Sequence, residues 1–131
     1  MKRLFFAVAA FMMAVGAMAS DKMTFVIGGP EEVYNQIRVE NETSLDTLTC
    51  RVVILKGEDE IESVYGVYNL YGIKDSDYNT ERIHRGTKLG IQMPDDFEGE
   101  LSFDVEYKDR PFFDYIVIHL RDKVSRFGDK L

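Results

Sequence analysis

Side chains that could support catalysis are few in this sequence, and their spacing is poor for it. The chain has two histidines, His84 and His119, and one cysteine, Cys50. A nucleophilic site needs a histidine beside a serine, yet no serine lies in a Gly-x-Ser-x-Gly turn. Zinc sites use histidine and cysteine at short spacings, which three residues this far apart do not offer. The sequence therefore argues against both kinds of site.

Paired carboxylates are the remaining catalytic option. They occur at Glu31–Glu32, Glu58–Glu60 and Asp95–Asp96, and at Asp104 with Glu106. Glycosidase acids normally lie in a deep cleft, which a short chain with short loops can barely build. We expect these residues in acidic turns and on solvent-facing strand positions, and we keep a small hydrolase only as an alternative.

One segment has the spacing of a metal site. Asp75, Asp77 and Asn79 alternate as oxygen ligands do at the start of a calcium loop. The wider EF-hand pattern then fails, because Thr80 replaces the glycine and Gly86 replaces the final glutamate. Asp, Ser and Asn also favour turns through bonds from side chain to backbone. We expect a solvated turn without a cofactor, with a weak calcium site as the alternative.

Aromatic residues are the best candidates for recognition. Tyr65, Tyr68 and Tyr71 fall in one expected strand, and Phe112 and Tyr115 follow a turn. Tyrosine joins an apolar ring to a hydrogen-bonding tip, which suits protein partners and sugar faces. Strand alternation places Tyr65 and Tyr71 on one face and Tyr68 on the other. These five residues are the predicted binding residues for a protein or glycan, and core packing is the alternative.

Three further polar features are expected to be structural. His119 is out of phase with its apolar neighbours and should face solvent or an adjacent strand. The basic run 82–85 reads as a solvated face, with anion binding as the alternative. The sequon Asn41-Glu42-Thr43 fits a turn at the end of a strand and matters only in a cell that glycosylates such sites.

The first 19 residues have the layout of a secretory signal peptide. Lys2 and Arg3 precede an uncharged run over 4–15, and Ala17-x-Ala19 provides the small-residue cleavage pattern. The full uncharged stretch, 4–20, has 17 residues. That is short of the roughly 20 needed to span a membrane. We therefore expect cleavage after Ala19 and export to the periplasm or the extracellular space. No cysteine lies at the cleavage site, so the exported chain is not expected to be a lipoprotein.

Cleavage makes the chain more acidic. Removing 19 of 131 residues leaves 112, and loss of Lys2 and Arg3 moves the net charge from −7 to −9. Such a charge disfavours nucleic acid, because phosphate contacts dominate that affinity. The chain also lacks a basic amphipathic helix and a second apolar run of spanning length, so membrane insertion of the mature chain is not expected.

The elements that must position these residues are strands. No alanine follows residue 19, and Val, Ile, Thr, Phe and Tyr make up 38 of residues 20–131. Apolar residues alternate with polar ones in most expected strands, most cleanly over 101–107, and Cys50 shares the apolar phase of its strand. The expected strands cover 23–27, 33–39, 48–54, 61–71, 87–93, 101–107 and 112–120, with a short one near Ile83.

This pattern predicts an all-β fold with seven or eight strands. We expect a single antiparallel β-sandwich over 20–131, immunoglobulin-like or similar, with the prolines between strands. A lone cysteine allows no internal disulfide, so a core that includes Cys50 must hold the domain together. We expect a non-catalytic binding or accessory module. A structural subunit that pairs through its sheet edges is the first alternative.

Overall fold

The computed structural model describes residues 23–123, and that part of the chain contains ten strands and no helix. It therefore holds no helical segment that could cross a membrane. The expected signal peptide, 1–19, lies outside the described residues. The strands are β1 (Thr24–Val26), β2 (Val33–Tyr34), β3 (Gln36–Glu42), β4 (Leu48–Lys56), β5 (Glu60–Leu70), β6 (Ser76–Asn79), β7 (Ile83–His84), β8 (Lys88–Gln92), β9 (Leu101–Arg110) and β10 (Phe113–Asp122).

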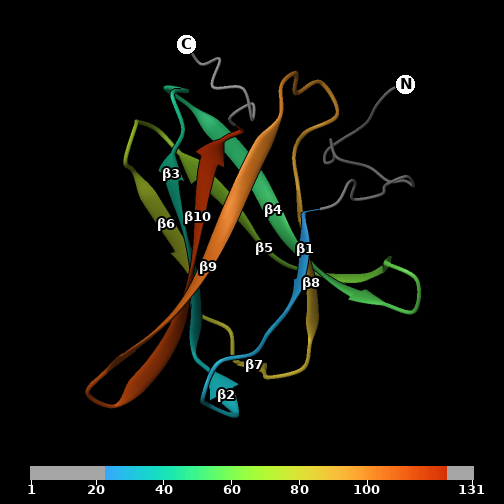
Figure 1. Cartoon of the computed structure of the whole chain (residues 1–131), viewed down its shortest axis with the longest axis vertical. Helices are drawn as coiled ribbons and strands as arrows, with labels where there is room; N and C mark the ends of the chain where they lie inside the picture. Colours follow the sequence, from blue (N-terminus) through green and yellow to red (C-terminus); the bar gives the residue numbers. More distant parts are fainter. Residues whose placement is uncertain (1–22, 124–131) are drawn as a thin grey trace.

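Eight of these strands form two four-stranded sheets (Figure 1). One sheet has the order β1-β8-β4-β5 and the other the order β6-β3-β10-β9, while β2 and β7 form a small separate pair. Six of the seven strand pairs are antiparallel. The pair β3–β10 is parallel, which the expectation of a wholly antiparallel fold missed. Alternation within one strand carries no information on the direction of its neighbour, so this pair could not be predicted.

The local sequences of β9 and β10 explain the positions of these two strands in their sheet. β10 lies between β3 and β9 and is the most apolar strand of its sheet, as a central strand should be. Its side chains from Tyr115 to Ile118 are all buried. β9 lies at the edge and alternates half-buried with exposed residues over most of its length. The all-β prediction is confirmed for the described residues.

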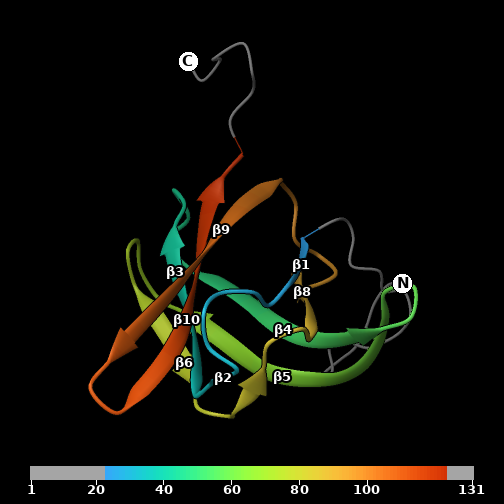
Figure 2. The same cartoon turned by 60° about the horizontal axis from the view of Figure 1, so that its bottom comes forward.

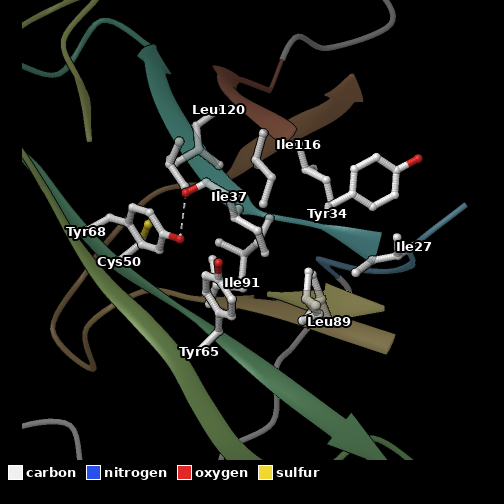
Figure 3. Close-up of a cluster of buried hydrophobic side chains, with 14 of the residues drawn as sticks. Ile27, Tyr34, Ile37, Cys50, Tyr65, Tyr68, Leu89, Ile91, Ile116 and Leu120 are labelled. Atoms are coloured by element: carbon white, nitrogen blue, oxygen red, sulfur yellow. Dashed lines mark hydrogen bonds between the residues drawn. The ribbon is translucent and has the colours of Figure 1, made fainter. Parts of the chain in front are cut away.

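The core consists of side chains that both sheets contribute (Figure 3). Ile37 and Ile116 come from one sheet, and Leu89 and Ile91 from the other, all with at most 2 % of their surface exposed. Cys50 is fully buried among them, which confirms its expected position. Burial raises the pKa of its thiol to about 12, so the sulfur is a packed, unreactive group.

The main departure from the expected strands is at residues 75–79. Ser76–Asn79 forms β6, paired with β3 at one edge of the sheet, where a solvated turn was expected. The expectation was wrong because Asp and Asn are poor strand formers when their side chains are unpaired. Here tertiary partners satisfy those side chains.

Candidate functional site

Two of the five predicted binding residues are in the core instead of on the surface. Tyr65 and Tyr68 are 5 % and 0 % exposed and point between the sheets (Figure 3). A β-bulge explains why both point inward. Val52 pairs with Gly66 and Val53 pairs with Val64, which leaves Tyr65 as an extra residue in β5. The bulge shifts the alternation by one residue, so Tyr65 and Tyr68 share the buried face.

The two buried hydroxyls connect the sheets. The Tyr68 hydroxyl donates to the carbonyl of Ile37 in β3 at 3.0 Å. The Tyr65 hydroxyl donates to the Glu81 carbonyl at 2.5 Å and accepts the Glu81 N–H at 3.0 Å. Burial raises the pKa of both phenols, so both stay neutral donors at physiological pH. The Tyr65 hydroxyl also contacts the Asn79 carbonyl of β6 at 3.1 Å, so both hydroxyls join β5 to the opposite sheet.

The other three aromatic residues are not neighbours. Tyr115 is buried beneath two guanidinium groups, those of Arg38 and Arg110, which lie 5.9 and 5.5 Å from the centre of its ring. Tyr71 is 76 % exposed just after β5 ends. Phe112 lies in the turn between β9 and β10. The predicted residues therefore do not form one continuous aromatic patch.

Phe112 has an unusual position at the turn of the β9–β10 hairpin. Its side chain is fully exposed, and its backbone φ is +75°. Because the proline ring holds φ of Pro111 near −65° and φ of Phe112 is positive, the two φ values match those of a type II turn. Glycine is the usual residue where Phe112 lies, since a side chain there is strained. A large apolar side chain is thus held in solvent on a strained backbone.

A charged cluster covers the outer face of the β6-β3-β10-β9 sheet. Its members come from β3 (Glu40, Glu42), β9 (Asp104, Glu106) and β10 (His119, Arg121). His119 Nδ1 lies 2.6 Å from Glu42, and Nε2 lies 2.9 Å from Glu106. Arg121 bonds Glu42 at 2.8 Å and also pairs with Asp104. The cluster joins three neighbouring strands across the sheet.

Mutual interactions shift the protonation of this cluster. Desolvation lowers the pKa of His119, but hydrogen bonds to Glu106 and Glu42 outweigh it, and the net pKa is raised. The bond from Arg121 lowers the pKa of Glu42, and the bond from His119 lowers that of Glu106. These hydrogen bonds therefore stabilise the imidazolium form of His119. Both ring nitrogens already contact carboxylates, so neither is free to take a proton from a substrate.

The same cluster contains a set of potential metal ligands. Glu40, Glu42 and His119 each offer a ligand atom, and these atoms lie within 4.8 Å of one another. Imidazole and carboxylate together suit zinc or manganese. In this structure His119 contacts Glu40 and Glu42, and Arg121 pairs with Glu42. The cluster could not be predicted from the sequence, because its six members come from three segments whose adjacency depends on strand order.

The predicted calcium residues have a different role in the structure. Asp77 accepts the N–H of Asn69 at 3.0 Å, and Asp75 accepts the N–H of Tyr71 at 2.8 Å. The amide of Asn79 donates to the carbonyl of Val67 at 3.3 Å. Alternate residues at 75–79 thus bond outward-facing backbone groups of β5 and of Tyr71, which follows it. Their spacing matches this strand edge, and whether calcium binds remains a prediction.

The sequon asparagine is also structural. Asn41 is fully buried, and its amide nitrogen donates to the carbonyls of Leu45 and Gly72 at 2.9 and 3.0 Å. Its side-chain oxygen accepts the N–H and the hydroxyl of Thr43. A glycosylated Asn41 could not keep these bonds, so the motif serves to fasten the end of β3.

A cavity of about 510 Å³ opens beside β7 and the β4–β5 hairpin. Lys56, Arg82, His84 and Lys88 line it together with Glu62 and Glu81, and Lys88 also pairs with Asp59. Arg85 instead pairs with Glu32 at 2.7 Å. Basic side chains outnumber acidic ones around the cavity, and anion binding at residues 82–85 stays a prediction. Comparison of the chain with protein-family models, with curated proteins and with solved structures found no match.

Proposed function

We propose that this chain is an exported, non-catalytic β-sandwich domain that binds a protein partner through the turn of its β9–β10 hairpin. The shared core of two four-stranded sheets supports the sandwich. An immunoglobulin constant-type domain has four strands in one sheet and three in the other. An immunoglobulin-like version of this domain would have four strands in each sheet. The signal-like residues 1–19 support export.

The observation that carries the binding proposal is the conformation of Phe112. A fully exposed phenylalanine with positive φ is unfavourable twice, once for its solvation and once for its backbone. Such strain occurs preferentially at binding and catalytic sites. The turn lies at the periphery of the molecule in both views, where a partner can approach it (Figures 1 and 2).

The chemistry of this turn favours a protein over a glycan. Phenylalanine has no hydrogen-bonding group on its ring, whereas a ring that binds a sugar is better suited when it carries such a group. Two tyrosines that could have supplied such tips, Tyr65 and Tyr68, are buried. An apolar ring entering a desolvated pocket is a common anchor of protein interfaces. A glycan partner remains the second possibility, with Tyr71 as its most exposed tyrosine.

Affinity capture from the envelope of the producing cells tests the proposal. Phe112→Gly removes the ring and supplies the residue that the turn prefers, so the fold is kept. Tyr71→Ala is the matched control, because it removes another exposed aromatic ring. We expect a protein retained by the wild type and by Tyr71→Ala to be lost with Phe112→Gly, and its purified form to bind with the same pattern.

Two outcomes contradict the proposal. One is a partner that binds Phe112→Gly as tightly as the wild type. The other is loss with Tyr71→Ala alone, which would favour the glycan alternative. Mass analysis of the exported chain tests the other part of the proposal: it should begin at Ser20, and a chain that keeps Met1 in the producing cells would contradict export.

A further inference from the structure

The outer edge of β9 has no strand partner among the described residues. β9 is the last strand in the order β6-β3-β10-β9, so only its β10 side is paired. Its inward side chains Phe103 and Val105 are half-buried. The corresponding residues of β10, Leu120 and Ile118, are 0 % exposed. A ten-residue strand with one open edge is a template for pairing with another chain.

The backbone groups that face outward can be identified from the register. The Asp114 carbonyl accepts the N–H of Asn35, on the β3 side of β10. Since backbone groups alternate in direction along a strand, Tyr115 bonds toward β9 and pairs there with Lys108. It follows that every second residue from Phe103 to Asp109, including Tyr107, presents its N–H and C=O at the open edge.

The alternate residues of β9, at positions 104, 106, 108 and 110, have acidic side chains toward one end of the strand and basic side chains toward the other. Asp104 and Glu106 are acidic, and Lys108 and Arg110 are basic, all on the outer face of the sheet. One half of the edge is therefore negative and the other half positive. Such a strand is complementary to a second copy of itself running in the opposite direction.

We propose that two copies of this chain pair antiparallel through β9, about a twofold axis at Tyr107. In this register Tyr107 lies opposite the partner's Tyr107, and its outward backbone groups exchange hydrogen bonds. Asp104 then faces the partner's Arg110, and Glu106 faces the partner's Lys108. Symmetry repeats both contacts, which gives four pairs of opposite charge. These pairs occupy the positions without backbone bonds, where the side chains of an antiparallel pair are closest.

The charge pattern selects this register over its neighbours. Moving the axis by one residue, to Glu106 or to Lys108, would place that side chain against the partner's copy of itself and would leave two pairs of opposite charge in place of four. Moving it by two residues, to Val105 or to Asp109, would place Asp104 against the partner's Glu106 or Lys108 against the partner's Arg110. Each of these shifts brings like charges together, which is destabilising. A partner strand with another sequence would need this same charge order, which the second copy has by symmetry. The inference is independent of the binding role of Phe112, because the paired segment, 104–110, ends before that residue.

Charge reversal and complementation test the pairing by sedimentation velocity of the exported chain over a concentration series. We expect concentration-dependent dimers for the wild type. Lys108→Glu with Arg110→Glu should raise the dimer Kd at least about tenfold, because four attractive pairs become repulsive. Asp104→Lys with Glu106→Lys should do the same. Mixing the two variants should restore a dimer, since each then meets the opposite charge.

Lys56→Glu with Lys74→Glu is the matched control, because it makes the same change in net charge at exposed positions outside β9. It should dimerise as the wild type does. Since Asp104 and Glu106 also bond Arg121 and His119, circular dichroism must first show that their variant is folded. If it is not, Asp109→Pro takes its place: it removes one outward N–H from the edge and should abolish the dimer. A monomeric wild type at high concentration, or a charge-reversed dimer of unchanged Kd, would overturn the pairing.

Discussion

The two long openings between the sheets are closed by different means. At the β5/β6 side, Asp77 and Asn79 bond the backbone of β5, and Asp75 bonds the backbone of the next residue, Tyr71. At the β1/β9 side, the described contacts are fewer. The rings of Phe25 and Phe103 lie 5.7 Å apart, and the Tyr107 hydroxyl accepts the N–H of Gly28. The first opening is sealed by the domain itself, whereas the second leaves β9 with an unpaired edge.

This difference follows from chain connectivity. β5 and β6 are consecutive, and a short segment joins them, so their side chains meet with little loss of entropy. β1 and β9 lie at distant points in the chain, and β1 has only three residues. The sealed opening uses polar side chains to protect an edge that would otherwise pair with other chains. The open edge is where we place the contact between two copies.

The largest effect should come from removing Asn41, which fastens β3 to the connection between β5 and β6. Asn41→Ala should lower the free energy of unfolding by about 2 to 4 kcal/mol, because all four hydrogen bonds of this buried side chain are lost together. Urea unfolding measures this. Asn69→Ala is the control, since its exposed side chain accepts a single bond from Thr49, and it should change stability by less than about 0.5 kcal/mol. If both substitutions lowered the free energy of unfolding equally, Asn41 would not be the residue that stabilises this side of the domain.

The next effect concerns the aspartates on β6. Asp75→Ala with Asp77→Ala should cost about 1 to 2 kcal/mol in total, because the backbone N–H groups of Asn69 and Tyr71 lose charged acceptors at an exposed edge. Hydrogen exchange of the Asn69 and Tyr71 amides should accelerate at the same time. Asp46→Ala with Asp109→Ala removes two exposed carboxylates elsewhere and should leave both quantities nearly unchanged.

Calcium distinguishes this interpretation from the metal-loop alternative. Because the carboxylates already accept backbone bonds, millimolar calcium and a chelator should give the same unfolding midpoint. If calcium raises the midpoint of the wild type and not that of the double alanine variant, residues 75–79 form a metal site after all.

At the hairpin beside the open edge, a substitution should stabilise the fold. Phe112→Gly should raise the free energy of unfolding by up to about 1 kcal/mol, because relief of backbone strain exceeds the added entropy of the unfolded chain. Thermal unfolding measures the gain. Phe112→Ala keeps the strain and serves as the control. If glycine proves less stable than alanine, the turn is not strained in the manner described.

The smallest effect is a dependence on pH, carried by the cluster that ties β9 to its sheet. The pKa of His119 is raised in the folded state above its ordinary 6.5. Its stabilisation is therefore complete below that value and is lost as pH rises through the folded pKa. Unfolding free energies from about pH 6 to about pH 8 should decline in the wild type, and the decline should vanish in His119→Gln. A decline that survives in His119→Gln would assign it to another group.

The pKa shifts of Glu42 and Glu106 have the opposite sign and act in another pH range. Both carboxyls have a folded pKa below the ordinary 4.5. Their stabilisation is present above that value and is lost as pH falls through the folded pKa. The two ranges do not overlap, so the decline above pH 6.5 isolates His119.

Local patterns were enough to predict the class of fold and much of the core. Enrichment in β-branched and aromatic residues, together with period-two alternation, predicted all-β structure and the burial of Cys50, because strand propensity and face are properties of neighbouring residues. A different local pattern, basic residues followed by an uncharged run and Ala17-x-Ala19, predicted a signal peptide at 1–19.

Tertiary structure decided what depends on neighbouring strands. The bulge at Tyr65 shifted one strand by a residue and buried a tyrosine expected outside. The strand order brought β3, β9 and β10 together and so assembled the cluster around His119. Bonds to the backbone of β5 placed Asp77 and Asn79 in a strand, where a solvated turn was expected. In each case the deciding contact joins residues of different strands, and no single segment of sequence records its partner.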